Sequence, residues 1–205
     1  MEGIKHPADK WNIILRHKYY QQQQIHKKQL RVDHIRQIFT LIEKQPHVYE
    51  IKRLRVWLDT CDREDLEMFI KQDYLQKLLN LLHGFEKLAR KSKNYGIQLE
   101  ILRIFELVVK NQLGLHALTM LQESATIILF NFTEFHSELN CLILTILVQL
   151  LWQSDLEFYV MVEAINKYKQ EKFKDYRFQM FIDILKTNKN LILLENVIIF
   201  VLILV

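Results

Sequence analysis

The sequence contains very little glycine and proline, with four and two residues respectively in a chain of 205. These residues supply most tight turns in β-sandwiches and βαβ proteins, so their scarcity argues against both classes. Half of the residues are hydrophobic and a quarter are charged, as is usual for a folded globular protein. Apolar residues recur at helical spacing along most of the chain. The composition and the periodicity together predict an all-α fold.

Cysteine and long hydrophobic runs are also scarce. Cys61 and Cys141 lie far apart in apolar runs, which favours a reducing compartment and core packing over a disulfide. The most apolar stretch, 191–205, is shorter than the roughly 18–20 residues that span a bilayer, and Glu195 interrupts it. We therefore expect a core helix there and no transmembrane segment. The charged residues 1–10 lack the apolar centre of a signal peptide.

Patterns that carry catalytic or metal chemistry are missing. The four glycines are isolated, so no phosphate-binding loop is predicted. The eight histidines are scattered and none is paired with another His or a Cys at the spacing of metal ligands. No serine lies in a nucleophile-elbow motif. We expect no catalytic residue, no metal and no cofactor, and hence a protein that is not an enzyme.

Positive charge is concentrated at the N-terminus. Residues 1–36 hold eight basic and three acidic side chains, a net charge of +5, whereas the whole chain has a net charge of +4. Such a basic arm favours an acidic partner, although a merely solvated arm fits the charge equally well. Nucleic acid is not expected, because no basic stripe is interleaved with the aromatic residues.

The N-terminal part predicts three helices in succession. Pro7 marks a helix start and the apolar pattern continues to Leu30. Asp33 can cap a second helix that Pro46 ends. A third helix begins near Val48.

Beyond this point the chain reads as a repeat. Residues 54–82 hold three apolar helical runs with short polar breaks, a unit that must stack on a copy of itself to bury its apolar side. Apolar runs centred near Val56, Phe105, Ile146 and Ile199 recur at roughly 40–55 residues, close to the armadillo and HEAT period. The pattern predicts an α-solenoid. Since the last apolar run reaches Val205, we expect the natural protein to continue.

The order of these segments resembles the N-terminal regulatory region of diaphanous-related formins. The matching features begin with Pro7, Lys10-Trp11, Ile38-Phe39, Leu41-Ile42 and Leu54-Arg55-Val56-Trp57-Leu58. They continue with Leu66-Glu67-Met68-Phe69, Leu75-Gln76-Lys77-Leu78-Leu79-Asn80-Leu81-Leu82, Glu100-Ile101-Leu102-Arg103-Ile104-Phe105, Asn111-Gln112-Leu113-Gly114-Leu115 and Val162-Glu163-Ala164-Ile165. The order and the gaps match over nearly the whole chain, and the order is more specific than any single motif.

The resemblance implies an armadillo-like α-solenoid preceded by a small helical GTPase-binding subdomain. Residues 1–50 would form that subdomain and residues 51–205 an armadillo-repeat inhibitory domain. In the family, a GTP-bound Rho-family small GTPase binds this region and displaces the formin's own C-terminal autoregulatory helix, which controls actin filament assembly. Actin would be affected only indirectly, because the actin-assembling domains are absent from this chain. The implied location is cytoplasmic, at the cytoskeleton or the cell cortex.

The resemblance also assigns site residues. The GTPase-contacting turn of the family falls on Asp59, Thr60 and Cys61, with Val56 on the preceding helix and Trp11 in the N-terminal subdomain. The family usually has asparagine-rich residues at this turn, so Asp-Thr-Cys is a departure. The groove for the autoregulatory helix falls on Leu147 and Leu150. Leucine in place of a small residue would fill that groove.

Three other interpretations fit the sequence. Val56 and Leu147 have the spacing of ordinary core residues. The chain can also be read as a generic armadillo or HEAT adaptor that binds a peptide or helix without GTPase dependence. A helical-repeat RNA binder that uses the basic arm is the third interpretation. Nucleotide dependence and salt dependence of binding distinguish them.

Overall fold

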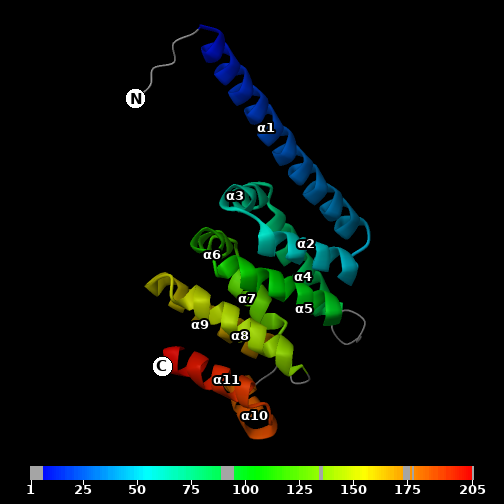
Figure 1. Ribbon diagram of the computed structural model, residues 1–205. Coiled ribbons are helices and arrows are strands. Elements are labelled where there is room, and N and C mark those ends of the chain that lie inside the picture. Colours follow the sequence, from blue (N-terminus) through cyan, green and yellow to red (C-terminus); the bar gives the residue numbers. More distant parts are fainter. Residues whose placement is uncertain (1–6, 89–94, 134–135, 173–175, 177, 205) are drawn as a thin grey trace. The chain divides into compact units, whose positions relative to one another are not determined.

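The computed structural model describes residues 7–88, 95–133, 136–172, 176 and 178–204, without the side chains of 7–13, 15, 23–28, 86–88 and 155. All regular structure in these residues is helical (Figure 1). The helices are α1 (Pro7–Lys44), α2 (Val48–Thr60), α3 (Arg63–Lys71), α4 (Tyr74–Leu88), α5 (Tyr95–Val109), α6 (Gln112–Thr119), α7 (Ser124–Phe130), α8 (Ser137–Leu151), α9 (Asp155–Glu171), α10 (Gln179–Thr187) and α11 (Leu191–Leu204). The prediction of an all-α fold is therefore confirmed.

The chain divides into two compact units, residues 1–45 and 46–205. The first unit consists of one long helix, α1, rather than the two helices that the sequence predicts. Asp33 does not cap a helix start; its carboxylate accepts hydrogen bonds from Gln29 Nε2 at 3.1 Å and Arg36 Nη1 at 3.2 Å. These partners lie four residues before and three after it, so the side chain supports a continuous helix.

Short polar turns separate the helices of the second unit, and side chains cap several of them. His47 accepts a hydrogen bond from the Tyr49 backbone at the start of α2. Asp62 caps α3 through the Asp65 backbone at 2.9 Å, and Asn111 caps α6 through the Leu113 backbone at 2.9 Å. These polar residues satisfy backbone N–H groups that a helix start leaves free, which fixes where each helix begins.

The helices of the second unit pack in a recurring order. α2 packs on α5, α5 on α8 and α8 on α11, so four helices lie side by side (Figure 1). In parallel, α3 contacts α6, α4 contacts α7, and α7 contacts α9. The runs near Val56, Phe105, Ile146 and Ile199 fall on α2, α5, α8 and α11, respectively. We call these four helices the ladder.

The core of the second unit is apolar and continuous along the ladder. Phe69, Phe105, Phe181 and Phe200 are among its largest fully buried side chains. Within the described residues no single helix is long and apolar enough to cross a membrane, although α6 and α7, bent by 89°, have the length and composition together.

Candidate protein-binding surfaces

The turn between α2 and α3 presents most of the residues predicted to bind a GTPase. Val56 is 58% exposed, Asp59 and Thr60 are exposed, and Cys61 is half-buried. The buried side of α2 carries Ile51, Leu54 and Leu58. Val56 lies off this stripe, so the interpretation of Val56 as a core residue is wrong.

Thr60 ends α2 with its own side chain. Its hydroxyl donates to the Val56 carbonyl at 3.2 Å and the Trp57 carbonyl at 3.1 Å, and the Cys61 N–H donates to the Leu58 carbonyl. These bonds use carbonyls that the end of a helix leaves without partners. The turn is thus held in a defined shape while Asp59 remains exposed beside it.

A small pocket of about 140 Å³ lies next to this turn. The α2–α3 turn contributes one side and the end of α5 with the α5–α6 turn contributes the other; the lining residues are Leu58, Cys61, Asp62, Arg63, Leu66, Leu107, Val108 and Asn111. The two turns are alike in that Asp62 and Asn111 each cap the following helix. A pocket of this size suits a single side chain of a partner rather than a cofactor.

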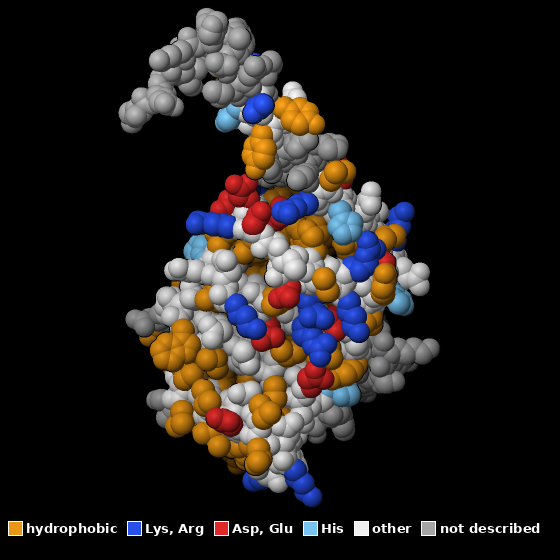
Figure 2. Space-filling view, viewed as in Figure 1, with side chains coloured by type: hydrophobic (Ala, Val, Ile, Leu, Met, Phe, Trp, Pro, Cys, Tyr) orange, Lys and Arg blue, Asp and Glu red, His pale blue; other side chains and the backbone are white. Residues whose placement is uncertain are grey.

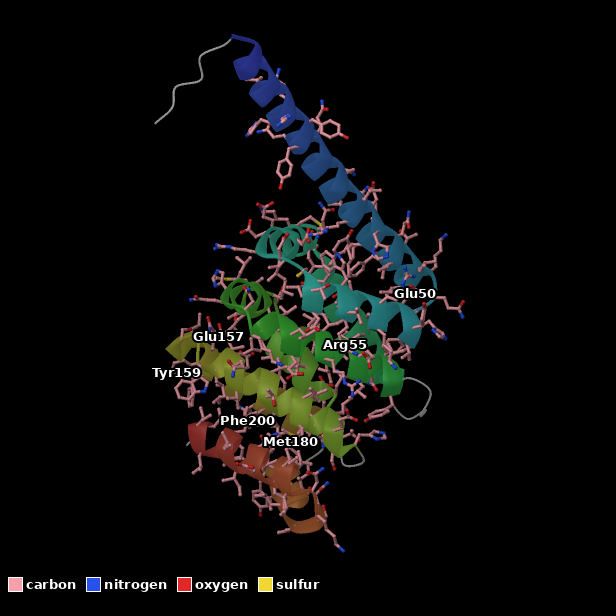
Figure 3. The ribbon with its side chains drawn as sticks, viewed as in Figure 1. Glu50, Arg55, Glu157, Tyr159, Met180 and Phe200 are labelled. Carbon is pink, nitrogen blue, oxygen red and sulfur yellow. The ribbon has the colours of Figure 1, made fainter. Side chains whose placement is uncertain are left out.

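A chain of ion pairs crosses the ladder. The Glu100 carboxylate on α5 accepts hydrogen bonds from Arg55 Nε on α2 at 2.9 Å and from Arg103 Nη1 at 2.6 Å. Arg103 Nη2 donates in turn to Glu138 on α8 at 2.6 Å. Figure 2 shows charged side chains of both signs gathered over this part of the molecule, and Figure 3 places Arg55 between α2 and α5.

Burial distinguishes this network from a surface ion pair. The Glu100 side chain is only 2% exposed, whereas Arg55 and Arg103 are each 33% exposed. Burial opposes ionisation of Arg103, yet its hydrogen bonds to Glu138 and Glu100 outweigh that effect and raise its pKa. The pKa of Tyr95 is raised by burial and by the nearby Glu138 carboxylate. The ladder therefore presents two guanidinium groups that are held in place and partly open to solvent.

Sequence reasoning missed this network, although a signal was present. Arg55 and Glu100 are 45 residues apart, within the spacing of the apolar runs, and Arg103 and Glu138 are 35 apart, a little below it. Residues one repeat apart on stacked helices are neighbours in space. Opposite charges at that separation therefore indicate an ion pair between adjacent helices.

Leu147 and Leu150 on α8 do not line an open groove, which corrects the expectation from the sequence. They are 0% and 1% exposed, respectively. The reason is that α8 contacts α5, α7, α9 and α11, so its apolar residues are covered from several sides. The core interpretation of Leu147 is the one that the structure supports. The Trp11 side chain lies outside the described residues.

An exposed apolar surface lies at the α11 end of the ladder. Figure 2 shows hydrophobic side chains gathered over the start of α9 and over α11. The large exposed residues there are Trp152, Leu156, Tyr159, Leu191, Ile192, Ile198, Ile199 and Leu202. A shallow groove of about 450 Å³ lies between them, lined by Leu151, Trp152, Ser154, Phe158, Tyr159 and Ile203. Figure 3 shows Tyr159 and Glu157 at the start of α9.

The described residues hold no group of three or more His, Cys, Asp or Glu side chains placed to bind a metal ion. Cys61 and Cys141 are not joined in a disulfide. No protein-family model matches the chain. No curated protein matches it either.

Proposed function

We propose that this chain is the regulatory module of a diaphanous-related formin, which binds a GTP-bound Rho-family GTPase and otherwise holds the formin's C-terminal autoregulatory helix. The observation that carries the proposal is the α2–α3 turn. The residues that match the family's GTPase-contacting turn, Val56, Asp59 and Thr60, are exposed at the end of a capped helix. A fixed, exposed turn is a suitable contact for a folded partner.

An armadillo-like solenoid is the fold that this proposal requires. The order of packing supports it. α2 contacts α5, α3 contacts α6, and α4 contacts α7. The ladder continues through α8 to α11. Repeats that contact mainly their neighbours are the defining feature of solenoids. Residues 1–50, which include α1, would supply the GTPase-binding subdomain.

The departure at the turn bears on the choice of GTPase. Asp59 carries a negative charge where the family usually has a neutral amide. A carboxylate favours a partner with a basic or hydrogen-bond-donating group at the matching position and disfavours an acidic one. We propose that the module selects a Rho-family protein that carries a basic or hydrogen-bond-donating group next to the surface that changes with the bound nucleotide.

The exposed face of the ladder is the proposed site of the autoregulatory helix. Leu147 and Leu150 are buried within α8, and Arg55 and Arg103 are basic groups of the ladder that a ligand can reach. An amphipathic helix that crosses α2, α5 and α8 would offer carboxylates to these guanidinium groups, which bind carboxylates well. This mode links the module to actin assembly indirectly, in the cytoplasm at the cytoskeleton or cell cortex.

The substitution Thr60→Asp tests the GTPase site. It replaces a neutral hydroxyl at the proposed contact with a charged group that lies beside the like-charged Asp59 and must lose its water when the partner binds, and a central interface residue contributes about 2 kcal/mol or more to binding. We expect at least roughly thirtyfold weaker binding to a GTP-loaded Rho-family protein in a calorimetric titration.

Thr187→Asp is the matched control for that substitution. Thr187 also ends a helix, and its hydroxyl donates to the Asp183 carbonyl at 2.7 Å as Thr60 donates to Val56. Both variants lose the same kind of hydroxyl-to-carbonyl bond at a helix end, so they should melt at similar temperatures and any difference in affinity belongs to the turn. Equal affinity of the folded Thr60→Asp variant and the parent would place the GTPase site elsewhere.

A generic helical-repeat adaptor is the second candidate. The partly exposed guanidinium groups of Arg55 and Arg103 favour it, because they suit an acidic peptide without any GTPase. An adaptor of this kind would bind such a peptide equally well with and without a GTP-loaded partner present. The formin module would release the peptide when the GTPase binds.

A further inference from the structure

The pocket beside the α2–α3 turn joins two turns of the chain in one cavity. Cys61 and Asp62 of the α2–α3 turn line one side of it, and Leu107, Val108 and Asn111 line the other. The helices that leave these two turns, α3 and α6, contact each other (Figure 1). Since Cys61 belongs both to the proposed GTPase contact and to the pocket wall, a partner bound at the turn lies against the pocket.

The inner wall of this pocket is apolar. Leu58, Leu66 and Val108 are buried, and Leu107 is half-buried. Water in such a pocket finds few hydrogen-bond partners on these side chains. An apolar side chain that displaces this water gains the free energy of burial. The inner wall therefore favours an apolar guest.

The rim of the pocket is polar but carries no net charge. Asp62 and Arg63 are exposed and of opposite sign, and Asn111 is neutral. The Asp62 carboxylate accepts a hydrogen bond from the Asp65 N–H at 2.9 Å. The Arg63 guanidinium pairs with Glu67 at 3.3 Å. A charged guest would thus lose its water here and meet charges that already have partners, which disfavours it.

Asn111 adds a hydrogen-bond donor at this rim. Its side-chain oxygen accepts the Leu113 N–H at 2.9 Å, which caps α6 and fixes the amide group. The side-chain NH₂ group forms no hydrogen bond with any other residue that the structure describes. Because Asn111 is exposed, these two N–H groups are available to an acceptor on a partner.

We propose that this pocket is the anchor site for one apolar side chain of the GTPase, and that the Asn111 amide donates to a carbonyl group of the same GTPase segment. The inference rests on the proposed function and extends its site from the α2–α3 turn to the α5–α6 turn. A side chain that fills a pocket surrounded by a polar rim is the arrangement of an interface hot spot.

The substitution Asn111→Asp tests the donor. Aspartate and asparagine cap helices equally well, so α6 keeps its start, whereas the donor is replaced by an acceptor that faces an acceptor. We expect about tenfold weaker binding to a GTP-loaded Rho-family protein in a calorimetric titration. Asn190→Asp is the matched control, because Asn190 caps α11 by the same kind of bond, to the Leu193 N–H at 3.1 Å. It should bind as the parent does.

The substitution Leu107→Phe tests the cavity. The larger ring takes up space that the anchor needs, so we expect at least about tenfold weaker binding, as for the loss of a hot-spot contact. Leu81→Phe makes the same change at a half-buried position of α4 that does not line the pocket. This control should bind as the parent does. A melting curve for each variant establishes that it is folded.

The substitution Asp62→Asn distinguishes an apolar anchor from a basic one. Asparagine keeps the cap of α3 and removes the negative charge from the rim. With an apolar anchor the affinity should stay within about threefold of the parent, as is usual for one exposed charge. A loss of about tenfold or more would show a lysine or arginine anchor and would overturn the proposal.

Two further outcomes separate this inference from the proposed function. If Thr60→Asp weakens binding but Asn111→Asp and Leu107→Phe do not, the GTPase site ends at the α2–α3 turn and only the inference fails. If the parent binds no GTP-loaded Rho-family protein, the proposed function fails and the inference fails with it.

Discussion

At the scale of single residues, Glu100 is the side chain on which the ladder surface depends most. Its carboxylate is almost fully buried, and it holds both Arg55 and Arg103. Glu100→Ala leaves two guanidinium groups without their shared partner, although water can reach a third of each. We expect a loss of about 1–3 kcal/mol in the free energy of unfolding, measured with urea.

Glu106→Ala is the control for that experiment. Glu106 lies on the same helix and pairs with Lys110 at 2.9 Å, but both side chains are far more exposed. Exposed pairs of this kind contribute about 0.5 kcal/mol or less. Similar losses in the two variants would show that the buried network is no more than a surface ion pair.

Glu157 gives a prediction about pH. Burial raises the pKa of its carboxyl above the ordinary value of 4.5. The folded chain therefore binds this proton more tightly than the unfolded chain, and the stability that it adds is lost as pH rises through the folded pKa. Glu157→Gln should melt at a higher temperature than the parent near pH 7, and the difference should disappear near about pH 3. A difference independent of pH would contradict this.

Some residue positions could be read from the sequence and others could not. Asp59 and Thr60 form a polar pair after an apolar helical run, a pattern that predicts a surface turn, and both are exposed. Leu147 and Leu150 were assigned to a groove by alignment of motifs alone. The helical spacing of Leu147 did indicate a core residue, but the number of helices that surround α8 and leave no groove there is not contained in any local pattern.

At the scale of helices, Gly114 fixes how α6 follows α5. A methyl group on Gly114 would lie 2.7 Å from Val108 Cγ1 and would also clash with the Val108 carbonyl oxygen. Backbone cannot move aside as the end of a side chain can. Gly114→Ala should therefore lower the free energy of unfolding by about 1–3 kcal/mol, measured by chemical denaturation.

Gly84 offers the opposite case in α4. A methyl group there meets no atom within 4 Å. Alanine also restricts the unfolded chain and favours a helix, so Gly84→Ala should stabilise the protein by about 0.5–1 kcal/mol. Stabilisation by both substitutions would show that the close approach of α6 to α5 is absent in solution.

The two ends of α1 could be predicted from local sequence chemistry, but its continuity through Asp33 could not. Pro7 starts α1, and α1 ends two residues before Pro46, as proline requires. The break predicted at Asp33 was wrong because aspartate is favoured both at helix starts and in pairs four residues apart. Only the partners Gln29 and Arg36 decide between these roles.

At the scale of the whole molecule, the spacing of apolar runs predicted the ladder. Runs near Val56, Phe105, Ile146 and Ile199 recur at one helix per repeat, and those helices pack on one another in that order. Periodicity predicts that successive apolar helices pack together, because each must cover the apolar side of the next. It does not show which sides remain open, and for that reason the charged ladder face and the exposed apolar surface at its α11 end emerged only from the structure.

The central claim is that the chain senses the nucleotide state of a Rho-family GTPase. The most direct measurement is the dissociation constant of the full chain for one such GTPase, determined with a non-hydrolysable GTP analogue and again with GDP. An effector must bind the GTP state more tightly, since equal affinities shift no population. The account predicts at least roughly a tenfold preference for the GTP form. Equal affinity for the two forms, or no binding across a panel of GTP-loaded Rho-family proteins, would contradict it.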